Sequence, residues 1–165
     1  PLIKDCFLAN NLVASKSSKK PKNNYIPIGW REWVYLPSHK NFGLKAKIDS
    51  GARSSAIHAT HIKEYVKKGE DRVKFRIYQA EEYLQIDTKL LSHKRITNSF
   101  GKTTTRPVIQ MKIKLGNNTW MTELTLAKRA RMTYPMLIGR SSLKKKHIIH
   151  SHKSYMTGVN SKGKK

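Results

Sequence analysis

Residues 45–58, K-A-K-I-D-S-G-A-R-S-S-A-I-H, join a predicted β-strand to a tight turn that carries a carboxylate. Leu44, Ala46 and Ile48 alternate with lysines, which is the period-two pattern of a half-buried strand. The strand ends in Asp49-Ser50-Gly51, a turn-prone triplet in which glycine relieves backbone crowding. A carboxylate on such a turn is well placed for chemistry, although the same triplet also forms ordinary Asx-type turns. Since the chain has only ten acidic residues, Asp49 is a candidate functional residue.

Alternating or apolar segments predict further short strands on both sides of this stretch. The clearest is a hairpin of residues 108–115 and 119–127, with Gly116-Asn117-Asn118 as its turn. Residues 61–71 and 90–106 are polar and predict connections, the first ending in a turn and the second flexible around Gly101. The other predicted strands are residues 30–36, 54–58, 73–78, 83–87, 136–140, 147–150 and 154–157.

These strands predict an all-β fold, either a small barrel or a sandwich. A brief helix is predicted at residues 141–145, with Ser141 as its N-cap. We expect one domain at residues 25–158, after a flexible basic leader (1–24) and before a basic tail (159–165).

The charge balance of the chain is strongly positive, with 34 lysines and arginines against ten acids and a formal net charge of +24. Such a field favours anionic partners and makes association sensitive to salt, but charge alone does not choose among nucleic acid, anionic lipid and acidic peptide.

The single cysteine, Cys6, excludes an internal disulfide framework and a cysteine-based zinc cage. No apolar run approaches the roughly 20 residues of a membrane-spanning helix. Because the sequence starts at Pro1, we expect a processed or truncated chain. Its expected location is cytoplasmic, with a removed export signal as the alternative.

A second segment, Met136-Leu137-Ile138-Gly139-Arg140, complements the Asp49 turn. An apolar strand that ends in glycine can pack beneath such a turn, because glycine allows close backbone approach. In order and separation, the two segments resemble a retropepsin half-site.

The chain resembles bacterial members of the retropepsin-like aspartic endopeptidase family, often labelled ATP-dependent zinc proteases. The resemblance covers most of the chain beyond the leader and is most specific around Asp49. It is carried by G-W-R-E-W (29–33), K-I-D-S-G-A-R-S-S-A-I-H-A (47–59), E-L-T-L (123–126), M-L-I-G-R (136–140) and S-Y-M-T-G (154–158).

The resemblance implies a small closed barrel-like retropepsin fold with one short C-terminal helix. It also implies a homodimeric aspartic peptidase in which each chain supplies one catalytic carboxylate, Asp49. Residues 99–101 would be the flap, with Gly101 touching substrate. The supporting residues would be Ser50, Gly51 and Ala52 in the catalytic loop and Leu137, Ile138 and Gly139 in the strand beneath it.

One departure from viral retropepsins concerns two arginines. Those proteins commonly carry an aspartate at the position of Arg53, where it pairs with the arginine of the later Gly-Arg motif. Arg53 and Arg140 cannot form that pair, so either the dimer contacts differ or both arginines bind an acidic substrate. Some relatives are linked to glutamate ligation of a ribosomal protein, which makes a glutamate-rich tail the candidate peptide substrate.

The family label names ATP and zinc, but the residues support neither. A phosphate loop needs G-x-x-x-x-G-K-[ST], and although Gly101-Lys102-Thr103 matches its second half, Ile96 occupies the position of the first glycine. Zinc hydrolysis needs a carboxylate at set spacing from two histidines. The chain has His58-x-x-His61 and His147-x-x-His150-x-His152 without one. We therefore expect no metal and no cofactor.

Two non-enzymatic functions are the alternatives. One is a basic β module that binds nucleic acid, specifically or non-specifically, through lysines and aromatic rings. The other is a peptide-binding module that has the fold without the activity. In alternating strands, however, aromatic residues are first of all core residues. The rings concerned are Trp30, Trp33, Tyr35, Phe75, Tyr78 and Trp120.

Overall fold

The computed structural model describes residues 25–97, 100–128, 133–143 and 146–158, so the predicted leader, the predicted tail and Ser99 lie outside the described residues. The described residues form strands and one short 3-10 helix, η1. Their bounds are β1 Ile26–Leu36, β2 Phe42–Asp49, β3 Ser55–His58, β4 Thr60–Lys67, β5 Glu70–Gln79, β6 Glu82–Lys89, β7 Ser92–Thr97, β8 Thr103–Leu115, β9 Asn118–Ala127, β10 Met136–Gly139, η1 Arg140–Ser142 and β11 His147–Ser154.

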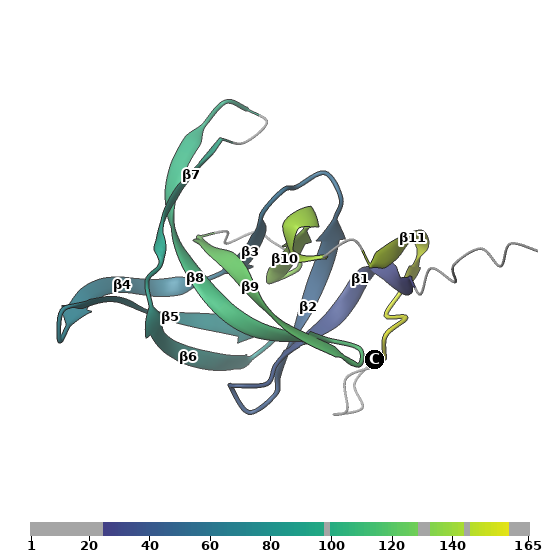
Figure 1. Ribbon diagram of the computed structural model, residues 1–165, viewed down its shortest axis with the longest axis horizontal. Coiled ribbons are helices and arrows are strands. Elements are labelled where there is room, and N and C mark those ends of the chain that lie inside the picture. The colour runs from purple at the N-terminus through teal and green to yellow at the C-terminus, as the bar shows by residue number, and fades with distance from the viewer. Residues whose placement is uncertain (1–24, 98–99, 129–132, 144–145, 159–165) are drawn as a thin grey trace, which may run out of the picture.

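Six strands close into a barrel (Figure 1). Around the barrel the order is β1, β2, β10, β3, β9 and β8, and β8 returns to β1 by pairing Leu115 with Val34. β11 extends the sheet beyond β1, and β7 extends it beyond β8. β4, β5 and β6 form a second, three-stranded sheet. The predicted all-β barrel is therefore confirmed.

The core follows from strand alternation. Leu44, Ala46 and Ile48 of β2 are buried, as the period-two pattern predicted. Phe75 of β5 is fully buried and joins the same apolar cluster, so the three-stranded sheet packs against the barrel. Each fully buried side chain of this size stabilises the fold by about 1.5–3 kcal/mol. Among the described residues, no helix has the length and apolarity needed to cross a bilayer.

Two segments predicted as connections are strands instead. Residues 61–71 contain most of β4, although the predicted turn is present at Lys68 and Gly69, which both have positive φ. Residues 90–106 contain β7 and the start of β8. Both β4 and β7 lack buried residues, so no alternation of apolar and polar side chains marks them as strands.

The C-terminal predictions also need correction. The strand predicted at 147–150 continues to Ser154 as β11, whereas residues 155–157, predicted as a further strand, contain a turn and no strand. Within the described part of the helix predicted at 141–145, the structure has the three-residue η1, which starts one residue early, at Arg140; residues 144 and 145 lie outside the described residues. Gly139 occupies its N-cap position and Ser141 lies inside it.

Residues 92–97 and 103–108, called the arm below, form a two-stranded projection that stands clear of the barrel (Figure 1). The arm continues the sheet from β8, whose second half belongs to the barrel wall. Because the two halves are one continuous strand, the barrel wall sets the direction in which the arm leaves the body.

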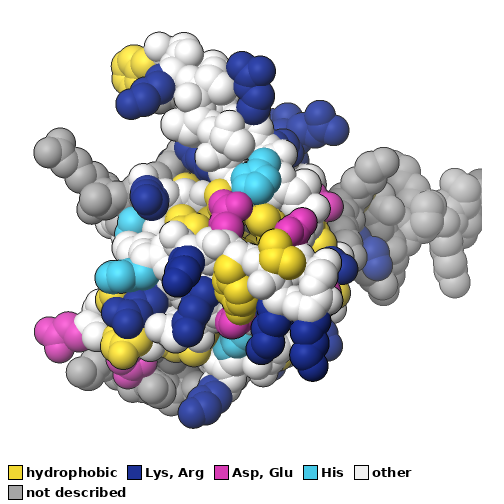
Figure 2. Space-filling model, turned by 90° about the vertical axis from the view of Figure 1, so that its left-hand side faces the viewer, with side chains coloured by type: hydrophobic (Ala, Val, Ile, Leu, Met, Phe, Trp, Pro, Cys, Tyr) yellow, Lys and Arg dark blue, Asp and Glu magenta, His cyan; other side chains and the backbone are white. Residues whose placement is uncertain are grey.

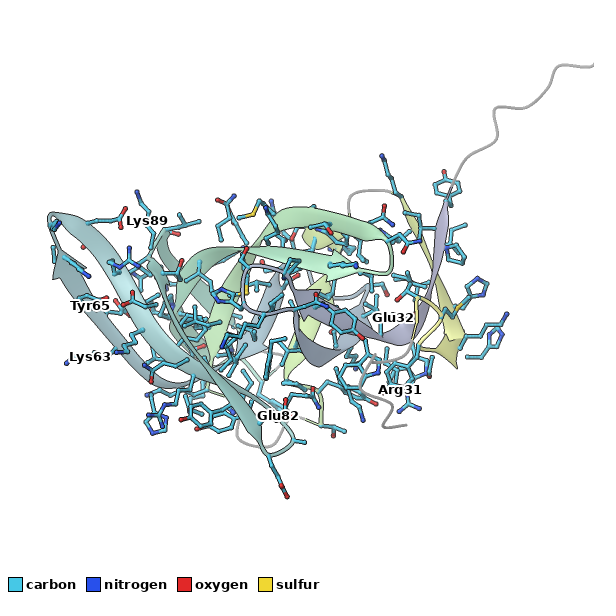
Figure 3. All side chains as sticks on the ribbon, turned by 90° about the horizontal axis from the view of Figure 1, so that it is seen from below. Arg31, Glu32, Lys63, Tyr65, Glu82 and Lys89 are labelled. Atoms are coloured by element: carbon cyan, nitrogen blue, oxygen red, sulfur yellow. The ribbon has the colours of Figure 1, made fainter. Side chains whose placement is uncertain are left out.

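Glu32 fastens the C-terminal segment to the barrel. Its carboxylate is fully buried on β1, next to Arg31 and close to β11 (Figure 3). Oε1 accepts hydrogen bonds from the backbone N–H of Gly29 (2.6 Å) and of Met156 (2.9 Å). Oε2 accepts two from Thr157, through its N–H (3.2 Å) and its hydroxyl (2.9 Å). A buried carboxylate is tolerated because its oxygens are satisfied in this way.

We expect Glu32→Gln to lower the free energy of unfolding by about 2 kcal/mol, because the new amide group turns a donor toward the donors of Thr157. Urea unfolding measures this loss. Glu123→Gln, an exposed glutamate on β9, is the matched control and should change stability little. Equal losses of unfolding free energy in the two variants would contradict a stabilising role of the buried Glu32 carboxylate.

Candidate active-site loop

The Asp49 carboxylate is fixed by the backbone of its own loop. β2 ends at Asp49, whose side chain is half-buried. Its Oδ1 accepts hydrogen bonds from the N–H of Gly51 (3.0 Å) and of Ala52 (3.2 Å). These donors hold the carboxylate in one orientation while leaving Oδ2 available for chemistry.

β10 lies directly beside this loop. It inserts between β2 and β3, with Gly139 opposite Asp49 in parallel register. The chain then turns into η1, where the N–H of Arg140 donates to the carbonyl of Ala52 (2.9 Å) and the N–H of Ser141 to that of Arg53 (3.0 Å). Leu137 and Ile138 are buried, and their role in supporting the loop stays a prediction.

Gly139 is required by this packing. A Cβ atom there would lie 2.6 Å from the carbonyl oxygen of Ser54 and 2.9 Å from that of Arg53. Both are backbone atoms, so they cannot move aside as a flexible side chain could. The need for glycine is steric, since the backbone at Gly139 is extended (φ −88°) and open to any residue.

A buried cluster of hydroxyl groups supports the same junction. The Ser55 hydroxyl accepts from the N–H of Gly139 (2.9 Å) and hydrogen-bonds the Ser142 hydroxyl (2.6 Å). Ser142 in turn hydrogen-bonds the Thr122 hydroxyl (2.6 Å). Sequence reasoning missed this cluster, and its only signal was a threonine at a core-facing position, Thr122.

Arg140 has a role that the sequence did not predict. Its Nη1 donates to the carbonyls of Ser50 (2.6 Å) and Gly51 (3.0 Å), so the guanidinium spans the tip of the Asp49 loop. Viral retropepsins would use a carboxylate partner, which Arg53 cannot supply here. Arg53 is exposed on the same loop. Substrate binding by either arginine stays a prediction.

The arm stands beside this loop. Lys94 of β7 donates to the hydroxyl of Ser54 (2.5 Å), just after the Asp49 loop. Near the tip, Gly101 has φ +77° and the Phe100 side chain is 93% exposed. The arm thus contacts the residue that follows the Asp49 loop, and both its role as a flap and contact between Gly101 and substrate stay predictions.

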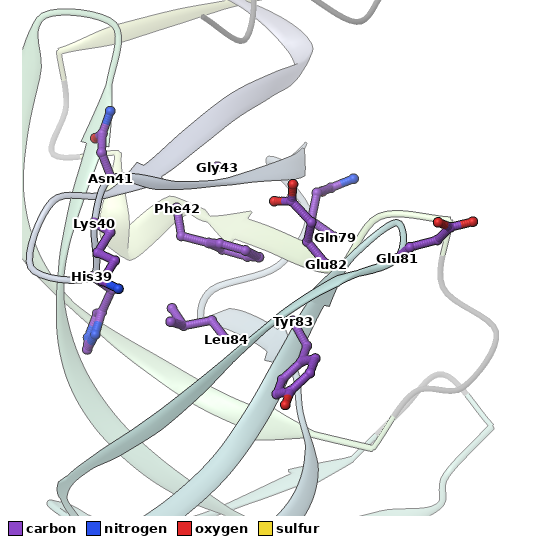
Figure 4. Close-up of a pocket in the computed structure, with 10 residues that line it drawn as sticks. All are labelled: His39, Lys40, Asn41, Phe42, Gly43, Gln79, Glu81, Glu82, Tyr83 and Leu84. Carbon is purple, nitrogen blue, oxygen red and sulfur yellow. The ribbon is translucent and has the colours of Figure 1, made fainter. Parts of the chain in front are cut away.

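One cavity lies at the other end of β2. It has a volume of about 630 Å³ and lies between the turn that precedes β2 and the β5–β6 hairpin (Figure 4). Phe42 and Leu84 point into it. Since β2 runs from Phe42 to Asp49, this cavity and the Asp49 loop are separated by the length of the strand. It was not predicted and takes no part in the site.

The described residues contain no group of three or more histidine, cysteine, aspartate or glutamate side chains placed to hold a metal ion. The rings of His150 and His152 lie 6.0 Å apart, and His58 Nδ1 lies 3.3 Å from the Ala127 carbonyl oxygen. Among the aromatic residues considered for stacking on bases, Phe75 and Trp33 are buried.

Comparison with known proteins gives a family match over most of the chain. Residues 27–158 match the RimB-like family, described as retropepsin-like aspartic endopeptidase RimB. A protein of unknown function from Legionella pneumophila, Lpg0085, has a similar structure, with a TM-score of 0.69 and 26% identity over 79% of this chain and 97% of that one.

The curated relatives are longer proteins. A probable alpha-L-glutamate ligase of Shewanella pealeana is 35% identical over 140 residues, which cover 82% of this chain and 31% of the relative. One of Desulfotalea psychrophila is 35% identical over 130 residues, covering 74% of this chain and 27% of the relative. The chain therefore spans about a third of the length of the curated relatives it matches.

We expect Gly139→Ala to cost about 1–3 kcal/mol of stability, because the added methyl group overpacks the backbone of residues 53–54. Thermal or urea unfolding measures the loss. Ser141→Ala, an exposed position two residues later, is the control. A Gly139→Ala variant as stable as the control would show that the two segments do not approach this closely.

Proposed function

The chain belongs to the RimB-like family of retropepsin-like aspartic endopeptidases, and we propose that it hydrolyses peptide bonds as a homodimer with one catalytic Asp49 in each subunit. One observation carries this proposal. The Asp49 carboxylate accepts hydrogen bonds from two backbone N–H groups, on a loop that lies beside β10. Since one chain contributes one such loop, a second copy would complete the site about a two-fold axis.

The proposed mechanism uses two facing copies of Asp49. Two carboxyl groups so close cannot both ionise readily, so they share one proton. The ionised one takes a proton from a water molecule, whose oxygen attacks the scissile carbonyl carbon. The protonated one donates a hydrogen bond to the carbonyl oxygen, and the leaving amine receives a proton as the C–N bond breaks. No covalent enzyme intermediate forms.

Charge supports an acidic peptide as substrate. Residues 60–89 hold six of the ten acids and seven of the 34 lysines and arginines, so this segment has a net charge of +1 and the rest of the chain carries +23. Near Asp49, the loop, η1 and the arm present Arg53, Arg140 and Lys94. A glutamate-rich chain would also offset the repulsion between two copies of +24 each.

The names of the relatives also support an acidic peptide as substrate. Proteins named probable alpha-L-glutamate ligase contain a region homologous to this chain within a longer polypeptide. A ligase that adds glutamate makes an acidic product, and a hydrolase of glutamate-rich tails would act on such a product. A peptide that ends in several glutamates is therefore the first substrate to test.

We expect Asp49→Asn to abolish hydrolysis of a glutamate-tailed peptide, because an amide can neither take a proton from water nor share one with residue 49 of the second subunit. Binding of the peptide should persist, since the amide still accepts hydrogen bonds at Oδ1. Cleavage is followed by mass spectrometry and binding by fluorescence anisotropy. Hydrolysis by Asp49→Asn at the wild-type rate would exclude this mechanism, and binding without hydrolysis by either protein would favour a non-catalytic module.

A mixing experiment tests the shared site. With Asp49→Asn in threefold excess, random pairing leaves only about a quarter of the wild-type subunits with a wild-type partner. The activity per wild-type subunit should fall to about that fraction. Activity that stays constant as the variant is added would mean that a single subunit suffices.

A further inference from the structure

The arm has two faces with different surroundings. In the β7–β8 ladder, Lys94 lies opposite Arg106 and Ile96 opposite Thr104, so these four side chains share one face. Arg95 lies opposite Thr105 and points to the other face.

The face with Lys94 is the one that looks toward the candidate active site. The Lys94 ammonium reaches the Ser54 hydroxyl (2.5 Å), and the Ser54 backbone lies against Gly139, which is opposite Asp49. We call this the inner face. Any peptide that passes between the arm and the Asp49 loop must contact it.

The arm carries positive charge without compensation along its own sequence. Residues 92–108 contain four lysines and arginines and no acid, and Figure 2 shows Lys and Arg side chains along this projection. On the inner face the charges are Lys94 and Arg106. One of the contacts of Arg106 is a hydrogen bond from Nε to the Thr104 hydroxyl (3.2 Å), so its guanidinium is held on this face.

We infer that Lys94 is a specificity-determining residue, which binds an acidic side chain of the peptide substrate between the arm and the Asp49 loop. This inference rests on the proposed function. An ammonium group has three donors, so it can hydrogen-bond the Ser54 hydroxyl and a substrate carboxylate together. Arg106 adds a second positive charge on the same face. Lys94 thereby couples recognition of a glutamate to the loop that carries the reacting carboxylate.

The contact between Lys94 and Ser54 is exposed and contributes little to stability. Lys94→Gln should therefore fold as the wild type does, which urea unfolding can verify. Arg95→Gln removes the same charge from the adjacent residue on the outer face and is the matched control for the general electrostatic field.

The test compares these variants on two labelled peptides, one with a six-glutamate tail and one with a six-glutamine tail. Loss of one charge-assisted hydrogen bond predicts that Lys94→Gln raises KM for the glutamate peptide by about tenfold with a smaller change in kcat. The glutamine peptide should be unaffected, and Arg95→Gln should change KM about twofold or less. Similar KM changes in Lys94→Gln and Arg95→Gln, or none in either, would overturn the inference.

The same substitutions in an Asp49→Asn background separate this inference from the proposed activity. There, anisotropy gives the Kd for the glutamate peptide without cleavage. A weaker Kd for Lys94→Gln than for Arg95→Gln supports the inner face as an acid-binding surface even if no peptide is hydrolysed by the wild type. Equal Kd values, or no binding of the glutamate peptide, would overturn the inference whatever the activity.

Discussion

The close backbone contact between Gly139 and residues 53–54 is the constraint on which the rest of the site depends. It lets η1 hydrogen-bond the far side of the Asp49 loop through the N–H groups of Arg140 and Ser141. The same approach brings the Arg140 guanidinium over the carbonyls of Ser50 and Gly51. The loop is thus held on both sides, and the orientation of the Asp49 carboxylate follows from backbone geometry more than from side-chain partners.

The few acidic residues are used selectively. Most of them lie in the three-stranded sheet, where Arg72 bridges Glu70 and Asp87, and this sheet is almost neutral. Glu32 is buried and serves the fold by holding the backbone of residues 156–157. Asp49 is left as the carboxylate of a loop whose charged neighbours are cations. This separation of charge leaves the barrel end that carries Asp49 with an excess of positive charge.

The barrel and the two halves of the candidate site could be predicted because each depends on a local pattern. Alternation marked β2, β5, β8 and β9, and the motifs around Asp49 and Gly139 carried the family resemblance. β4 and β7 were missed because neither strand contains a regular row of buried side chains, so there was no periodic pattern to detect. The hydroxyl cluster joins residues 55, 122 and 142, and contacts across three elements need the topology before they can be recognised.

The position of β10 has a consequence for how the protein is made. β10 is the last barrel strand along the chain, yet it fills the gap between β2 and β3, which are both completed by residue 58. The barrel therefore cannot close on the ribosome until residue 139 has emerged from the exit tunnel. Pairing between segments so distant along the chain also slows folding, because loop-closure entropy is lost before these contacts form. A nascent chain therefore lacks a closed barrel around the Asp49 loop until β10 has joined β2 and β3.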